Sequence, residues 1–152
     1  MRLCAHSIAE SADALTFTRE ARCPVVKLVD GWGQAAEFAA MDHAPLVVGR
    51  KVVDPELRPD YLAEHGFDPV EIADLYFDAN LRPHVLANPA VQAWEGPNEP
   101  VCKTPQAMRW YAAFEAQRVR RLGALGKRAV VGNFSVGQPE PELWPDLPYP
   151  AF

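Results

Sequence analysis

The chain has 152 residues, of which 49% are hydrophobic and 23% charged, as in soluble globular proteins, and this length suits one domain with its own core. Fifteen basic and 20 acidic residues give a net charge of −5, which argues against a nucleic-acid-binding surface. No run of about 18 apolar residues could span a membrane, and the first residues lack a signal peptide's apolar core, so we expect a cytoplasmic protein.

Short apolar runs alternate with helical patterns along the chain. We expect helices over residues 11–22, 34–41 and 68–87, and a longer one from residue 104 that carries the basic run 118–128 on a solvated face. Strands are expected between and around them, over 2–8, 24–30, 45–53, from 90 to 94 onward, and over 128–137.

Two helix starts carry specific signals. Asp68 stands at an N-cap position, with Pro69 at the first helical position and Glu71 three residues after the cap, an arrangement that fixes a helix start. Thr104 followed by Pro105 marks the start of the longer helix in the same way. These signals define where two of the helices between strands begin.

The order of elements predicts an α/β fold with a parallel sheet and right-handed crossovers. Two architectures remain open. One is a partial (β/α)8 barrel containing strands one to five, with residues 1–137 in the barrel and 138–152 as a proline-rich loop or truncated segment. The other is a five-stranded doubly wound sheet. In both, ligands gather at the carboxyl ends of the strands.

Charged residues also lie within the predicted strands. Lys27 and Arg50 each interrupt an apolar run, and Glu95 follows Trp94. A buried charge is costly unless it is paired, so we expect a polar network in which Glu95 faces Lys27 or Arg50. In an extended segment residues 95, 97 and 99 share one face. Glu95 is therefore expected deeper in the sheet, and Glu99 at its lip.

The segment W-E-G-P-N-E-P, residues 94–100, resembles the fourth-strand motif of the clan A retaining glycoside hydrolases, of the family 39 or family 5 type. These are (β/α)8-barrel enzymes. The resemblance implies that Glu99 is the general acid/base, that Asn98 binds the 2-hydroxyl of a sugar, and that Glu95 is an acidic residue within the barrel. It implies a carbohydrate substrate and no cofactor or metal.

Three further residues stand at or near the predicted strand ends and are candidates for substrate binding. Trp32 is expected either to stack on a sugar ring or to pack in the core. His6 is expected either in the pocket floor or as a hydrogen-bonded core residue. Arg50 is expected to reach a hydroxyl or carboxylate of the substrate, or to pair with Glu95.

The resemblance also implies a second glutamate, the nucleophile, at the end of a seventh strand. No glutamate here matches it: Glu140 and Glu142 lie in a proline-rich stretch expected to be extended. We therefore expect a fragment of a longer enzyme that is inactive by itself, or a truncated relative that self-associates through its open edge and inner face. The alternatives are a non-catalytic carbohydrate-binding or structural remnant of the barrel, and a doubly wound domain of unrelated activity.

Overall fold

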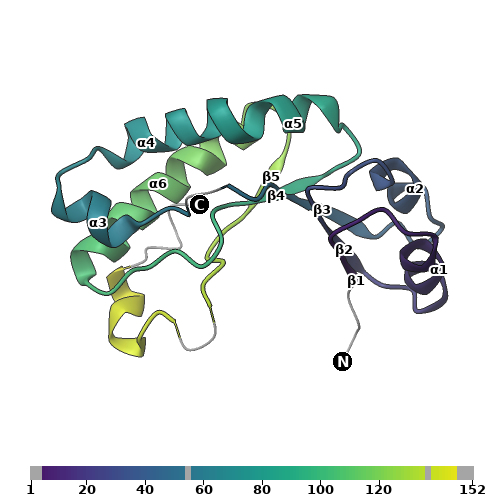
Figure 1. Cartoon of the computed structure of the whole chain (residues 1–152), viewed down its shortest axis with the longest axis horizontal. Coiled ribbons are helices and arrows are strands. Elements are labelled where there is room, and N and C mark those ends of the chain that lie inside the picture. Colours follow the sequence, from purple (N-terminus) through teal and green to yellow (C-terminus); the bar gives the residue numbers. More distant parts are fainter. Residues whose placement is uncertain (1–4, 54–55, 136–137, 147–152) are drawn as a thin grey trace.

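The computed structural model describes residues 5–53, 56–135 and 138–146, in which five parallel strands alternate with helices (Figure 1). The strands are β1 (Ala5–Ser7), β2 (Val25–Val29), β3 (Leu46–Arg50), β4 (Ala93–Glu95) and β5 (Arg128–Val130). The α-helices are α1 (Ala12–Glu20), α2 (Ala35–Ala39), α3 (Pro59–Glu64), α4 (Pro69–Tyr76), α5 (Arg82–Ala87) and α6 (Pro105–Gly123).

The strands lie side by side in the order β1-β2-β3-β4-β5, and every neighbouring pair is parallel. The predicted α/β class with a parallel sheet is confirmed. A doubly wound sheet would place its first strand in the interior, whereas β1 lies at an edge. The sequential order is the one in which strands follow one another around a (β/α)8 barrel.

Both predicted helix starts are present. Asp68 Oδ1 accepts hydrogen bonds from the backbone N–H groups of Val70 and Glu71, at 2.8 and 2.9 Å. Thr104 Oγ1 accepts from the Ala107 N–H at 3.1 Å. These side chains satisfy backbone donors that the first turn of a helix leaves unpaired.

Several elements differ from the prediction. Helix α3 forms between residues 53 and 68, where the sequence predicted neither a helix nor a strand, and Pro59 at its first turn suits a helix start. The helix expected over 68–87 is divided by a π-helical turn, Phe77–Leu81, just before Pro83, which has no N–H to donate. The tail expected to be extended forms a 3-10 helix, Pro141–Asp146.

The core lies on one face of the sheet. Val26, Leu28, Val47 and Trp94 point to this face and are at most 2% exposed, because the helices cover it. Residues of the alternate register form the other face, where Val25, Lys27 and Leu46 are only half-buried. A depression of about 340 Å³ lies on that face. In a closed barrel this face would point inward.

None of the helices in the described part of the chain is long and apolar enough to cross a membrane.

Candidate functional site

The loop after β4 carries two of the candidate residues beside the carboxyl ends of β3 and β5. Asn98 and Glu99 follow β4 in the loop that leaves the sheet, and the Glu99 N–H donates to the carbonyl of Asn133, beyond β5, at 2.9 Å. Glu99 has a φ of 45°, in the left-handed region that non-glycine residues seldom adopt. Its side chain is exposed. The loop therefore presents Glu99 to solvent from a strained backbone position, a feature that concentrates at functional sites.

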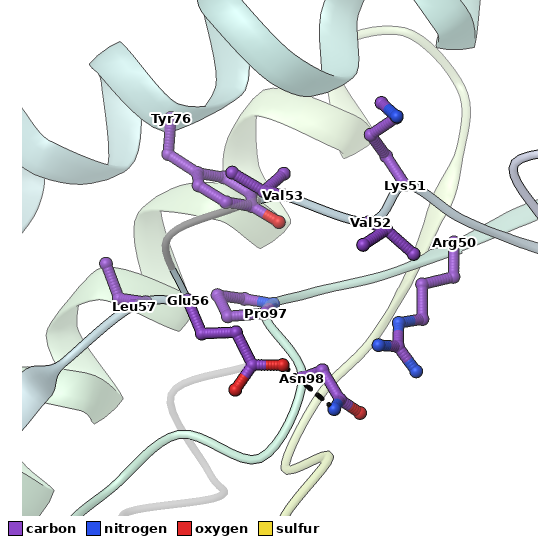
Figure 2. A pocket seen from close by; sticks show the side chains of 9 residues that line it. All are labelled: Arg50, Lys51, Val52, Val53, Glu56, Leu57, Tyr76, Pro97 and Asn98. Atoms are coloured by element: carbon purple, nitrogen blue, oxygen red, sulfur yellow. Dashed lines mark hydrogen bonds between the residues drawn. The ribbon is translucent and has the colours of Figure 1, made fainter.

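A small pocket opens beside this loop, between the end of β3 and the residues after β4. It holds about 10 Å³, room for one water-sized group. The Nδ2 of Asn98 donates to Glu56 Oε1 across it at 3.2 Å (Figure 2). The side chains that line the pocket come from three segments of the chain: Arg50, Lys51, Val52, Val53, Glu56, Leu57, Tyr76, Pro97 and Asn98.

Two polar groups of this pocket lack hydrogen-bond partners among the described residues. One is the buried Nε of Arg50, and the other is the hydroxyl of Tyr76, a residue only 8% exposed. Burial raises the pKa of Tyr76 to about 12, so its hydroxyl stays protonated at neutral pH. Buried polar groups are nearly always paired, and unpaired ones in a pocket are available to a ligand.

Glu95, the last residue of β4, lies on the face of the sheet that carries Val25, Lys27 and Leu46, and it precedes the loop that carries Glu99. Its Oε2 lies 2.6 Å from Lys27 Nζ, and the two side chains are 10% and 26% exposed. Lys27 Nζ and Glu95 Oε2 therefore form an ion pair, but their relative orientation does not suit a hydrogen bond. This is one of the two pairings expected from the sequence. Arg50, the other expected partner, forms no ion pair with Glu95.

A buried ionic network on α6 holds the end of β4 in place. Arg118 Nε and Nη2 donate to Glu115 Oε2 at 2.8 and 2.5 Å, and Tyr111 donates its hydroxyl proton to Glu115 Oε1 at 2.8 Å. Arg118 also donates to the carbonyl oxygens of Trp94, at 3.1 Å, and of Val130, at 2.6 Å. The guanidinium thus links the carbonyl of Trp94, near the end of β4, to that of Val130, at the end of β5. The Asn98–Glu99 loop follows this end of β4.

This network requires a glycine immediately after the strand. A β-carbon at Gly96 would lie 2.6 Å from Glu115 Oε1 and 2.9 Å from Arg118 Nη2, closer than real β-carbons approach. Gly96 of the W-E-G-P-N-E-P segment therefore permits the close contact between α6 and the strand end.

The expectation of a solvated face for residues 118–128 is wrong at Arg118, whose side chain is 0% exposed. It holds at Arg120, which is exposed. Charge alone does not tell which arginine of a basic run points inward. The signal was the helical spacing, since Tyr111, Glu115 and Arg118 follow one another at intervals of four and three residues and so share a helix face.

The remaining candidates lie away from the pocket. The Trp32 ring packs between His84, at 4.8 Å between ring centroids, and Trp94, at 5.3 Å, and its Nε1 donates to the Leu28 carbonyl at 3.2 Å. His6 is exposed at the sheet edge and borders the depression on the open face. The structure therefore joins Asn98 with Arg50 and brings neither Trp32 nor His6 to them.

Glu56 and Tyr76 are pocket residues that sequence reasoning missed. Both lie outside predicted strand ends: Glu56 in the loop after β3, and Tyr76 at the end of α4. Nothing in the local sequence marks them, because their proximity to Asn98 arises from the packing of the β3–β4 connection.

Within the described residues, no three histidine, cysteine, aspartate or glutamate side chains gather as ligands of a metal ion would. Comparison of the chain with protein-family models, with curated proteins and with solved structures finds no match.

Proposed function

We propose that this chain carries the acid/base part of a retaining glycoside hydrolase site, with Glu99 as the proton donor. The observation that carries the proposal is the position of Asn98 and Glu99 directly after the fourth strand of a sequentially ordered parallel sheet. Ligands of such sheets bind at this edge. The W-E-G-P-N-E-P segment, residues 94–100, supplies the chemistry by its resemblance to the clan A motif.

The local geometry supports the roles of the two residues. Glu99 is exposed, and no side chain of the described residues forms an ion pair or hydrogen bond with its carboxylate. Its carboxyl group is therefore accessible to the oxygen of a glycosidic bond. Asn98 offers an amide next to it, which can bind a sugar hydroxyl more strongly as charge develops in the transition state.

Retention of configuration also needs a second carboxylate about 5–5.5 Å from the first, acting as the nucleophile. We assign this part to no described residue. Glu95 is engaged with Lys27, and Glu56 accepts a hydrogen bond from Asn98. In the barrels that the motif resembles, the nucleophile follows a seventh strand.

Because Glu95 and Glu56 both already have partners, a second candidate function is a carbohydrate-binding domain without catalysis. In that case Asn98 and Glu99 would bind sugar hydroxyls, and Glu99 would serve only as a hydrogen-bond acceptor. The two candidates share the ligand class and differ in whether Glu99 transfers a proton.

The test uses the complete gene product that carries this sequence and a panel of methyl glycosides and oligosaccharides. We expect hydrolysis with retained anomeric configuration, and NMR of the released sugar would show the configuration of the first-formed product. The substitution Glu99→Gln removes the proton donor and keeps the side chain's size. It should lower kcat/KM by about 10²–10⁴-fold while leaving sugar binding within a few fold.

Glu20→Gln is the matched control, because Glu20 is exposed at the end of α1 and takes no part in the site. It should leave kcat/KM unchanged. Full activity in Glu99→Gln would refute the acid/base assignment. Binding without hydrolysis by the parent protein would support the carbohydrate-binding domain instead.

A further inference from the structure

We propose that Arg50 binds a carboxylate of the ligand, so that the sugar recognised at this edge is a uronic acid. The inference rests on the proposed function only in taking the ligand to be a carbohydrate. It adds the class of sugar, which the motif itself does not specify.

Among the described residues, Arg50 is a cation at this edge without an acidic partner. Lys51, next in the chain, pairs with Asp30 at 3.1 Å between Nζ and Oδ1, and Lys27 pairs with Glu95 at 2.6 Å. Among the described residues Arg50 forms no ion pair, and its buried Nε has no hydrogen-bond partner. A half-buried guanidinium with an unused donor is costly, and an anionic ligand group would remove that cost.

The guanidinium favours an anionic group over a neutral hydroxyl, and a carboxylate is the anionic group of a uronic acid. Its planar N–H fork matches the two oxygens of a carboxylate, and such charge-assisted bonds are about twice as strong as neutral ones. Figure 2 shows the guanidinium extending from the end of β3 toward Asn98. A ligand carboxylate on Arg50 would therefore hold the attached ring near Asn98 and Glu99.

The size of the pocket sets how the ligand enters. A volume of about 10 Å³ admits a single polar atom, such as one carboxylate oxygen, and excludes a sugar ring. The Tyr76 hydroxyl points into this space (Figure 2) and has no hydrogen-bond partner in the described part of the chain. It is a neutral donor at pH 7 and can bond to the oxygen that enters. The ring itself would remain outside, over the lip.

The acidic residue Glu56 lines the same pocket, and its negative charge would disfavour binding of an anion there. Its carboxylate, however, is exposed and already accepts the amide of Asn98 at 3.2 Å. Solvent screens an exposed charge more than a half-buried one, so the balance at the Arg50 end of the pocket remains positive.

The experiment compares sugars that differ only in the group at C6. Methyl uronides and methyl hexosides of gluco, galacto and manno configuration are titrated into the protein at low ionic strength, and the dissociation constants are measured by calorimetry. For the configuration that binds best, we expect the uronide to bind about 10- to 100-fold more tightly than the hexoside. Added salt should reduce this preference.

Three variants locate the preference. Arg50→Met should bring the uronide to the affinity of the hexoside while hexoside binding, which reports the fold, persists. Arg50→Lys keeps the charge without the fork and should retain part of the preference. Arg128→Met is the matched control, an exposed strand arginine at the opposite, amino-terminal edge of the sheet, and should change nothing.

The outcomes separate this inference from the proposed function. Equal binding of uronide and hexoside, with no effect of Arg50→Met, would overturn the uronate assignment and leave a carbohydrate site. A preference lost equally in Arg128→Met would show a general charge effect and also overturn it. Failure of every sugar to bind would overturn both.

Discussion

Replacing Arg118 with methionine tests how the chain holds the end of β4. Arg118 is 0% exposed and its partner Glu115 is 1% exposed. Methionine matches the arginine stem in length but leaves the Glu115 carboxylate buried without its counter-charge. It also leaves the carbonyl oxygens of Trp94 and Val130 without donors. All three losses act in the same direction.

The expected magnitude follows from these contacts. Breaking one side of a buried ion pair costs about 3–5 kcal/mol, a large share of the roughly 5–15 kcal/mol by which domains are stable. With an m-value of about 2 kcal/mol/M in urea, the unfolding midpoint should fall by about 2 M. Tryptophan fluorescence reports the transition, since Trp94 and Trp110 are buried.

The double variant Glu115→Leu/Arg118→Met removes both charges together. It should cost less than the sum of the single variants, because neither leaves a lone buried charge. Arg120→Met, on the exposed side of the same helix, should change the free energy of unfolding by less than about 0.5 kcal/mol. A loss under about 1 kcal/mol for Arg118→Met, or simple additivity in the double variant, would refute the reasoning.

Three further outcomes are expected. Tyr76→Phe removes a buried, unpartnered hydroxyl and should leave the free energy of unfolding unchanged or raise it by about 1 kcal/mol at pH 7. Burial raises the folded-state pKa of Tyr76 to about 12, so the folded state disfavours the ionised phenolate, and the parent's free energy of unfolding should fall as pH rises from about 10 toward 12. Urea midpoints measured from pH 9 to 11 should therefore fall less in the variant, and equal falls would contradict this. Gly96→Ala should cost about 1–3 kcal/mol by forcing apart the Glu115 contact, whereas Gly123→Ala, with open space around it, should cost nothing; equal effects in urea would count against the contact. The Cys102 thiol is 1% exposed and burial raises its pKa to about 12, so iodoacetamide at pH 8 should not label it in the folded protein, as mass spectrometry would show, and rapid native labelling would disprove its burial.

Local signals in the sequence predicted much of the fold. The alternation of apolar runs and helical patterns located all five strands, and Asp68 and Thr104 marked the starts of α4 and α6. The pairing of Lys27 with Glu95 was among the expectations because a charge within a strand needs a partner. Each of these inferences depends on residues within a few positions or on a single physical requirement.

The remainder depended on long-range packing. The order of the strands distinguishes a barrel-like sheet from a doubly wound one. The same alternation of strand and helix patterns in the sequence is compatible with both architectures. Glu56 meets Asn98 across 42 residues of sequence, and Arg118 meets the Trp94 carbonyl across 24. Such contacts depend on how the helices pack against the sheet, and the hydrophobic periodicity of the sequence does not determine that packing.

The most direct test of the acid/base role is the dependence of hydrolysis on the leaving group. A series of aryl glycosides with leaving-group pKa values from about 4 to about 10 would be cleaved by the complete gene product and by its Glu99→Gln variant. If Glu99 donates the proton, kcat/KM of the variant should fall steeply as leaving-group pKa rises, and that of the parent only slightly. Parallel slopes for the two proteins would contradict the assignment of Glu99.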